Sequence, residues 1–497
     1  ADKMRPGMVL FSVVVLFLCV GILTPKEMLE GFSNKGMITV ALLFLVSEGI
    51  RQSGTLGQVI KKLLPQGKTT VFKAQLRILP SVAFISAFLN NTPVVVIFAP
   101  IIKHWAKSVK LPATKFLIPL SYVTILGGIC TLIGTSTNLV VHGMILEAGY
   151  EGFTMFELGK VGIFIAIAGI IYLFIFSKRL LPDARPDTAV PDEEVEEGEK
   201  LHRVEAVLGA RFPGINKKLS DFNFQRHYGA EVKEIKTRNG QRYVDHLEDV
   251  VLREGDTLVV MADDTFIPTW GESSVFVLLT NGNDPDTSGK KKRWLALILL
   301  VLMLVGATVG ELPATKEMFP DIKLDMFFFV CITTIIMAWT NIFPARKYTK
   351  YISWDILITI ACAFAISKAM VNSGVADCVA GFIIGLSDDY GPHVLLAILF
   401  VITNLFTELI TNNAAAALAF PLALSISAQL GVSPTPFFVV ICMAASASFS
   451  TPIGYQTNLI VQGIGNYKFT DFVRIGLPLN IITFLISVIL IPLIWNF

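Results

Sequence analysis

Long apolar segments with few charged residues recur along the chain on both sides of one polar stretch. Most are close to the ~20 residues that an α-helix needs to cross a bilayer, so the pattern predicts spanning helices. The first segment follows Lys3 and Arg5, as in a signal peptide, but no small-residue cleavage motif comes after it, so we expect a first span. The predicted spans are Val9 to Leu23, Met37 to Leu45, Phe116 to Ile129, Val161 to Phe176, Trp294 to Val309, Met326 to Trp339, Ile352 to Ile366 and Ile475 to Trp495.

Two halves of the membrane part are related by a nearly constant shift of about 320 residues along the chain. Several matches in the same order indicate an internal duplication rather than coincidence. The matched positions are Asn91 with Asn412, Pro100 with Pro421, Gly143 with Gly463, and Ile133 to Asn138 with Ile453 to Asn458.

The basic residues predict that the two copies are inverted. Ten Lys and Arg residues lie between Arg51 and Lys115, whereas the equivalent stretch from Val371 to Thr435 has none. Short cytoplasmic loops collect Lys and Arg, so the first copy's loops are expected to face the cytoplasm and the second copy's to face outward. Opposite orientation requires an even number of membrane crossings in the first copy plus one unmatched helix, at Trp294 to Val309. The segments Thr70 to Ser108 and Val394 to Gln429 must then be re-entrant hairpins that do not cross the membrane. Inverted repeats place a transport site near the bilayer midplane, where broken helices of both copies meet.

The composition of the chain agrees with burial in lipid. Of its 497 residues, 53% are hydrophobic and 16% are charged, and a soluble core of ordinary proportions would not bury so much apolar surface. The net charge of +2 does not indicate nucleic-acid binding, because the basic residues lie in short loops between spans. Six scattered cysteines predict neither disulfides nor a metal cage. No nucleophile with a base stands in the apolar segments, so an enzyme is not expected.

The polar stretch between the copies predicts a small cytoplasmic α+β domain. A Pro/Asp/Glu-rich linker, Pro182 to Lys200, precedes it, and basic residues bracket it. The predicted organisation is membrane repeat 1 at 1–181, linker and cytoplasmic domain at 182–292, and the extra helix with membrane repeat 2 at 293–497. The expected strands of the cytoplasmic domain are His202 to Leu208, Tyr228 to Ile235, Asp256 to Met261 and Ser274 to Leu279.

Three short motifs in this insert resemble the C-terminal ligand-binding domain of TrkA-type potassium regulators. They are Ala206 to Gly214, Leu219 to Phe222 and Leu252 to Val260. The resemblance implies pairing of such domains and a small nucleotide or ion as ligand, with a purely structural role in dimerisation as the alternative.

Polar residues interrupt both predicted hairpins at their tips, Ser86 to Pro93 and Thr407 to Ala414. Uncharged amides and hydroxyls in hydrocarbon are costly unless they line a cavity or find partners inside the protein. The end of the first arm presents carbonyl groups to a cation, and the start of the second presents N–H groups to an anion. Glycines and hydroxyls at Gly127 to Asn138 and Ser446 to Asn458 predict broken helices beside the tips. An isolated Asn pair would more often be a helix cap or interhelical contact, but the symmetric recurrence favours a site. Glu408 is expected either to tune the second tip or to pair with a neighbour.

With these elements, the membrane part resembles the divalent anion:sodium symporters of the ion-transporter superfamily. Members carry Ser-Asn-Thr at each tip, and the matching triplets are Asn90-Asn91-Thr92 and Thr411-Asn412-Asn413. The resemblance implies one sodium ion near Ser86, Asn90, Asn91 and Gly134, and a second near Thr407, Thr411, Asn412 and Gly454. It implies an anion at Asn90, Asn91, Thr92, Thr135, Ser136, Thr411, Asn412, Asn413, Tyr455 and Gln456.

The same resemblance implies a homodimer in the plasma (inner) membrane that works by an elevator motion, without an organic cofactor in the membrane part. Dicarboxylate carriers tend to have Thr-Pro where this chain has Thr135-Ser136 and Tyr455-Gln456, and the insert is similar to that of carriers assigned to sulfate. Sulfate is therefore favoured and a dicarboxylate comes next.

Two other functions remain open at this point. An ion channel regulated by the insert is one, although the chain lacks a TVGYG-type filter. A proton-driven exporter of arsenite, antimonite or another oxyanion on the same scaffold is the other. Each predicts a different driving force from sodium symport.

Overall fold

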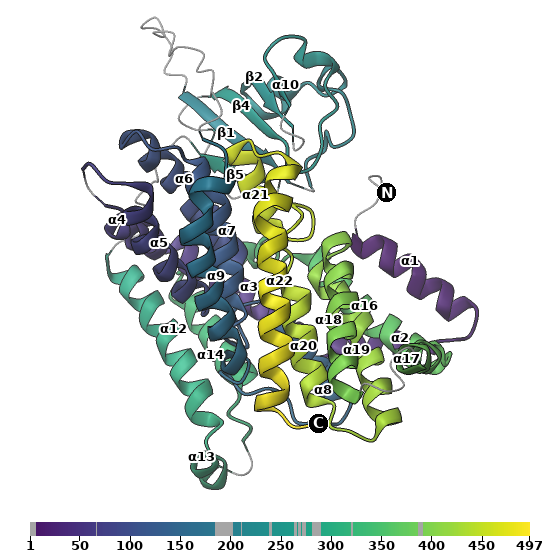
Figure 1. The fold of residues 1–497 in the computed structure, drawn as a ribbon. Helices are drawn as coiled ribbons and strands as arrows, with labels where there is room; N and C mark the ends of the chain where they lie inside the picture. The colour runs from purple at the N-terminus through teal and green to yellow at the C-terminus, as the bar shows by residue number, and fades with distance from the viewer. Residues whose placement is uncertain are drawn as a thin grey trace, which may run out of the picture.

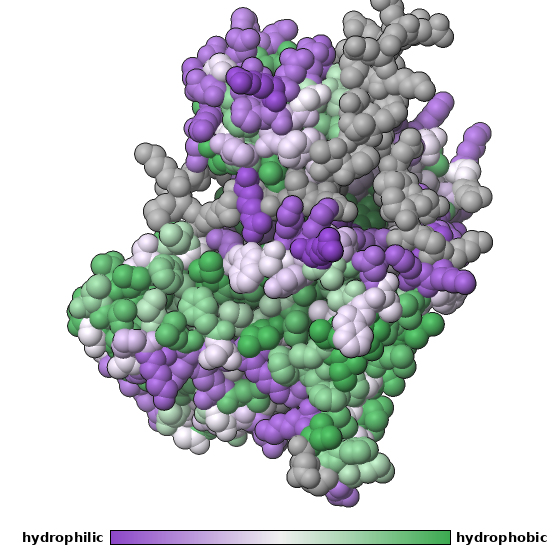
Figure 2. All heavy atoms as spheres, turned by 180° about the vertical axis from the view of Figure 1, so that it is seen from behind, coloured by the Kyte–Doolittle hydropathy of each residue, from purple (hydrophilic) through white to green (hydrophobic). Residues whose placement is uncertain are grey.

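The computed structural model describes residues 6–65, 67–183, 202–209, 211–237, 241–262, 266, 270, 275–280, 290–319, 322–385 and 391–497. The described part is mainly α-helical, with one small sheet at one end (Figure 1). A broad band of hydrophobic residues covers the helical part, and hydrophilic residues gather over the sheet (Figure 2). The predicted fold class, an α-helical polytopic membrane protein with a small α+β region, is confirmed. Seven described helices are long and apolar enough to cross a membrane: Pro25–Gln52, Gly159–Leu180, Lys291–Gly310, Trp354–Asn372, Gly391–Leu409, Asn412–Leu430 and Phe469–Ile494.

The helices fall into two series with the same order, and their spacing is closely similar up to the last helix of each series. The helix α12 (Lys290–Gly310), with the short α13 (Pro313–Met318), has no counterpart in the first series. The first series is α1 (Pro6–Cys19), α2 (Pro25–Glu30), α3 (Lys35–Gln52), α4 (Thr55–Leu63), α5 (Val71–Ser86), α6 (Asn91–Ser108), α7 (Thr114–Gly128), α8 (Ser136–Glu147) and α9 (Gly159–Leu180). The second is α14 (Met326–Trp339), α15 (Tyr348–Tyr351), α16 (Trp354–Asn372), α17 (Val375–Gly385), α18 (Gly391–Leu409), α19 (Asn412–Leu430), α20 (Thr435–Ser446), α21 (Gln456–Gly465) and α22 (Phe469–Ile494).

Matched turns have the same backbone conformation. Gly54 between α3 and α4 and Gly374 between α16 and α17 both have a φ of 71°. A left-handed conformation costs glycine little because it has no Cβ. The duplication inferred from the sequence thus extends to individual turns.

The two hairpins enter the molecule from opposite ends. The hairpin α5–α6 opens toward the end that carries the sheet, where Lys103 of α6 contacts Glu205 of the first strand. The hairpin α18–α19 opens toward the other end, where the ring of His393 packs against Phe497 at the C-terminus (Figure 1). Each first arm packs against the helix that follows its hairpin, α5 against α7 and α18 against α20. This is the inverted arrangement that the basic residues predict.

The α+β region has a hydrophobic core of its own. Its antiparallel sheet has the order β3 (Arg242–Tyr243), β2 (Glu231–Lys236), β4 (Thr257–Ala262), β1 (His202–Leu208) and β5 (Phe276–Thr280). A core of aromatic residues, including Phe212, Phe224 and Phe276, packs on the sheet. The helix α10 (Phe224–Tyr228) lies between β1 and β2 in the chain.

The predicted strand from Tyr228 to Ile235 is wrong at its start. Tyr228 is the last residue of α10, which the Asn223 side chain caps by accepting a hydrogen bond from the Arg226 N–H at 2.9 Å. Gly229, at a φ of 71°, ends the helix before β2 begins. The predicted start of the last strand at Ser274 lies outside the described residues.

Candidate functional site at the hairpin tips

At the first tip, three oxygen atoms lie close together and share the single proton of the Ser86 hydroxyl. Ser86 Oγ, at the end of α5, lies 2.7 Å from Asn91 Oδ1 and 2.9 Å from the carbonyl oxygen of Thr124. Ser86 and Asn91 are completely buried. A serine hydroxyl has one proton, so it satisfies only one of these two acceptors at a time. The tip therefore has more oxygen acceptors than donors, which suits a hard cation.

The second tip repeats this arrangement in the matched residues. Thr407 Oγ1 lies 2.8 Å from Asn412 Oδ1 and 2.6 Å from the carbonyl oxygen of Ala445. The Ser448 hydroxyl adds another oxygen, 3.4 Å from the Thr407 carbonyl oxygen. Gly128 stands at the matched position in the first copy, so the second tip has one more oxygen in this place.

A short loop in each broken helix is fastened to its hairpin by a threonine. Thr131 donates to the Ala87 carbonyl oxygen, and its hydroxyl accepts from the Gly134 N–H at 3.2 Å. In the second copy, Thr451 Oγ1 lies 3.1 Å from the Glu408 carbonyl oxygen and 3.4 Å from the Gly454 nitrogen. Both loops therefore pass close to the oxygen clusters at the tips.

Gly134 and Gly454 are sites where a side chain has no room. A Cβ added to Gly134 would lie 2.4 Å from the Gly128 carbonyl oxygen, and one on Gly454 would lie 2.0 Å from Ser448 Oγ. Gly134→Ala is expected to cost about 1–3 kcal/mol of stability and to abolish most transport, because backbone beside the first tip must move. Thermal unfolding and uptake measure both effects. The control is Gly385→Ala, where a Cβ meets nothing within 4 Å; equal behaviour of the two variants would contradict the prediction.

Contacts between the copies bring the two tips together. Asn91 Nδ2 donates to the Tyr455 hydroxyl at 2.6 Å, and Thr135 Oγ1 lies 3.0 Å from the same hydroxyl. The Asn412 side chain also interacts with it. The phenol of Tyr455 thus extends from the second copy into the space between both tips.

A second set of contacts joins the broken helix of the first copy to the second hairpin. Ser136 and Thr137 donate to Asn413 Oδ1 at 3.2 and 3.3 Å. Thr92 Oγ1 lies 3.4 Å from Gln456 Oε1. Hydroxyl and amide groups of both copies therefore surround one central place.

Four helices begin at this place. They are α6 at Asn91, α8 at Ser136, α19 at Asn412 and α21 at Gln456. The residues preceding α6, α8 and α21 make no side-chain cap, and before α19 the Thr411 hydroxyl accepts from the Ala414 N–H at 3.4 Å. First-turn N–H groups have no partner inside their own helix and favour anions. The arrangement can bind an anion with neutral donors alone.

Comparison with known proteins agrees with this architecture. A family model described as a citrate transporter matches residues 1–429 and 322–497. The chain belongs to the citrate transporter family. The second match begins just before the second helix series. The resemblance to divalent anion:sodium symporters is thereby confirmed, and the transporter is an integral membrane protein.

Three relatives show the range of the family. An uncharacterized transporter of Synechocystis sp. is 30% identical over 97% of this chain and 93% of its own length. A probable sodium/sulfate cotransporter 3 of Chlamydomonas reinhardtii is 32% identical over 56% of this chain and 31% of its own length. The sodium-dependent dicarboxylate transporter SdcS of Staphylococcus saprophyticus is 25% identical over 29% of this chain and 28% of its own length.

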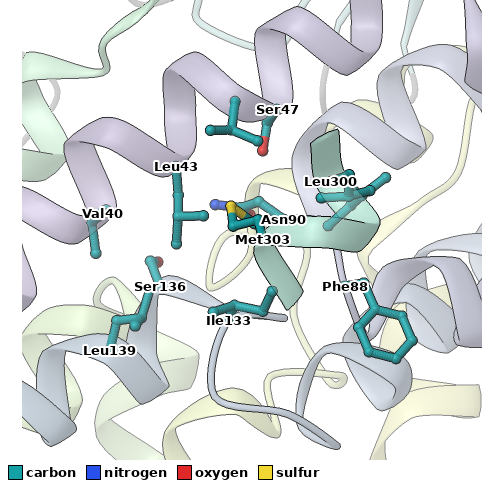
Figure 3. Close-up of a pocket in the computed structure, with 12 residues that line it drawn as sticks. Val40, Leu43, Ser47, Phe88, Asn90, Ile133, Ser136, Leu139, Leu300 and Met303 are labelled. Carbon is teal, nitrogen blue, oxygen red and sulfur yellow. The ribbon is translucent and has the colours of Figure 1, made fainter. Parts of the chain in front are cut away.

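One predicted site residue of the transporter lines a small cavity beside the first tip. Asn90 lines a small cavity between the first hairpin and helices α3 and α12, where Ser47 and Met303 lie nearby (Figure 3). Ser136 borders the same cavity, whose volume of about 10 Å³ is about the least that can hold one water molecule. Asn90 is thus placed at the boundary of the first tip with α3 and α12.

A much larger polar cavity lies at the end of the transporter opposite the sheet. Its volume is about 1090 Å³, and it shares Leu139 with the small cavity beside Asn90. Acidic and basic side chains both border it: Glu30, Lys35, His142, Glu147, Glu311, Lys316, Lys323, Asp325 and Lys368.

Several residues that hold the site were not predicted from the sequence. Asn458 Nδ2 donates to the carbonyl oxygens of Ser448 and Thr451 at 2.8 and 3.1 Å, which fixes the second loop. Asn138 donates to the Thr131 carbonyl oxygen at 2.9 Å in the first copy. Both threonines and both asparagines are matched by the repeat, so the alignment of the two copies contained the signal.

Glu408 belongs to the second tip rather than to an ion pair in the described part of the chain. Its carboxylate accepts from the Ser450 N–H at 2.8 Å and from Asn480 Nδ2 at 2.7 Å. The matched residue in the first copy is Ala87. Glu408 therefore pairs with neighbouring groups at the second tip, and its tuning of that tip stays a prediction.

Proposed function

We propose that this protein is a sodium-coupled symporter of a small divalent anion, with sulfate favoured over dicarboxylates. The observation that carries the proposal is the pair of matched oxygen clusters at the tips, around Ser86 and Thr407, with four helix N-termini between them. The family match makes the chain a transporter, and relatives named as sodium/sulfate and sodium-dependent dicarboxylate transporters support sodium and an anion as its cargo.

The proposed sodium sites lie at the two oxygen clusters. The first uses Ser86 Oγ, Asn91 Oδ1 and the loop at Gly134, and the second uses Thr407 Oγ1, Asn412 Oδ1 and the loop at Gly454. Asn138 is fully buried, and its Oδ1 has no hydrogen-bond partner among the described residues, so it offers another ligand near the first loop. A sodium ion satisfies acceptors that one hydroxyl proton leaves unpaired.

The proposed anion site lies between the clusters. No Lys or Arg occurs in the segments 90–92, 135–137, 411–413 and 455–456, so N–H groups, hydroxyls and the nearby sodium ions supply the attraction. Because Asn91 and Asn412 serve both kinds of site, bound sodium completes the anion site. The affinity for the anion therefore rises with sodium.

Tyr455 supports sulfate as the cargo. Its matched residue in the first copy is Thr135, and the two hydroxyls lie 3.0 Å apart. The larger phenol occupies space between the tips and turns a hydroxyl donor toward the centre. A compact tetrahedral oxyanion fits such a site better than an extended dicarboxylate.

The transport cycle that we propose is an elevator motion in a homodimer of the plasma membrane. The hairpins and broken helices move against a scaffold that includes α1 and α14, and the small cavity at Asn90 lies at the boundary with α3 and α12. The α+β domain faces the cytoplasm and is of the TrkA-C type, with a nucleotide or ion as its ligand. The large cavity is then the entrance from outside.

The test is uptake of labelled sulfate into proteoliposomes that contain the purified full chain. An inward sodium gradient is expected to drive accumulation, and potassium or choline in its place is expected to abolish it. Accumulation that follows a proton gradient would instead support an exporter running in reverse, and single-channel currents would support a channel. Either result would overturn sodium coupling.

A further inference from the structure

The α+β domain contacts two helices that bear the site. Its first strand lies against α21 and its last strand against α6. The helix α6 begins at Asn91 of the first tip, and α21 begins one residue after Tyr455. The domain is therefore positioned on the elements that form the site.

A charged pair joins the domain to α6. Lys103 Nζ lies 3.0 and 2.9 Å from the two carboxylate oxygens of Glu205 in β1, and Lys236 of β2 lies 3.3 Å from one of them. The side chains of Lys103 and Glu205 are only 22% and 17% exposed. Burial acts to raise the pKa of Glu205, but Lys103 and Lys236 outweigh it and lower this pKa to about 2. Glu205 therefore stays ionised throughout the physiological pH range, since its pKa lies well below that range.

A close backbone approach joins the domain to α21. Leu459 of α21 packs against Gly255, whose φ is 85°. One turn further along α21, a Cβ added to Gly463 would lie 2.8 Å from Thr257 Oγ1 and 3.2 Å from the Gly255 carbonyl oxygen. A larger residue at Gly463 would therefore separate α21 from the loop before β4.

The contact with α21 is adjacent to the second loop of the site. Leu459 follows Asn458, which holds the Ser448 and Thr451 carbonyl oxygens. Ser121 Oγ lies 2.7 Å from Asn458 Oδ1 and 2.8 Å from Thr457 Oγ1, so the start of α21 is also tied to α7. A shift of α21 at Leu459 would move Asn458 and Tyr455 together.

We propose that docking of the α+β domain on α6 and α21 holds the sodium and anion sites in their high-affinity arrangement. Release of the domain lowers affinity at both tips, which makes this surface the route by which the domain regulates transport. The inference rests on the proposed sodium symport for its functional consequence, and on the described contacts for the docking itself.

A double-mutant cycle tests the charged contact in the full-length transporter. Lys103→Gln and Glu205→Gln are each expected to raise the half-saturating sodium and sulfate concentrations at least about fivefold, the lower end of typical coupling between sites. The double variant is expected to resemble the singles, because both remove the same contact. The matched control is Lys233→Gln, which breaks an exposed pair with Glu231 in the same domain. Unchanged half-saturation in both single variants would overturn the proposal.

Hydrogen–deuterium exchange of peptides from α21 separates this proposal from the proposed function. The Lys103→Gln and Glu205→Gln variants are expected to exchange faster than wild type at 456–465, whatever the cargo is. Leu459→Ala is expected to do the same without a change of charge. If the wild type takes up no sulfate but α21 exchanges faster in the variants than in wild type, the proposed symport of sulfate is wrong and the proposed docking is supported. If α21 exchange is unchanged in all three variants, the docking fails.

Discussion

Replacing Asn91 or Asn412 by Ala is expected to reduce sodium-dependent sulfate uptake by more than about 100-fold. Each amide supplies an oxygen to a cluster with Ser86 or Thr407, at 2.7 and 2.8 Å, and each contacts the Tyr455 hydroxyl. Even groups that only support a metal ligand typically contribute 10- to 100-fold, so loss of a group shared by both kinds of cargo should cost more. Initial rates of uptake in proteoliposomes measure the effect.

The controls for the asparagine variants separate loss of the site from loss of the fold. Asn372→Ala removes an exposed amide that bonds to Glu27 and the Ile22 carbonyl oxygen, and it is expected to transport normally. Thermal unfolding without sodium should be within a few degrees of wild type for all three variants. Normal uptake by either tip variant would remove that asparagine from the site.

Substitution of Tyr455 is expected to change which anion is carried. Tyr455→Phe removes the hydroxyl between Asn91 and Thr135, and one hydrogen bond to a charged group contributes about 1.5–3 kcal/mol. The half-saturating sulfate concentration should therefore rise about 10- to 100-fold. Tyr455→Thr makes the position equal to Thr135 and opens space between the tips, so we expect uptake of succinate to appear while sulfate uptake weakens.

The matched control for Tyr455 is Tyr172→Phe. The Tyr172 hydroxyl donates to the Ile475 carbonyl oxygen at 3.0 Å between α9 and α22, away from the tips. Its loss should affect stability but neither half-saturation nor the ratio of sulfate to succinate uptake. An unaltered ratio in Tyr455→Thr would show that this residue does not set selectivity.

The sequence predicted the features that depend on periodicity and repetition. Spans follow from apolar runs, the inverted order follows from Lys and Arg, and the tips follow from polar residues that interrupt the hairpins at matched positions. These patterns are local in the sequence or occur in both copies. A pattern that is weak in one copy is therefore supported by the matched positions of the other. The matched contacts of Ser86 with Thr124 and of Thr407 with Ala445 show how far this symmetry extends.

Features that depend on long-range packing could not be predicted in the same way. The sequence places Tyr455 near the second tip. Its hydrogen bond with Asn91 depends on how the two copies pack together, because the two residues are 364 positions apart in the chain. The direction of Asn90 depends on the neighbouring surface of α3 and α12. The contact of Lys103 with Glu205 joins a hairpin to an inserted domain that has no repeat partner. The strand expected at Tyr228 became a helix end because capping by Asn223 and aromatic packing outweighed strand propensity.

The central claim is that sodium and anion share the two tips, and the sulfate dissociation constant at increasing sodium concentration tests it most directly. Sulfate binding to the purified transporter is measured by calorimetry, with choline replacing sodium at constant ionic strength. The dissociation constant is expected to fall steeply as sodium rises, and sulfate is expected to tighten sodium binding by the same factor. This coupling should disappear in Asn91→Ala. A sulfate dissociation constant that does not change with sodium would contradict the account.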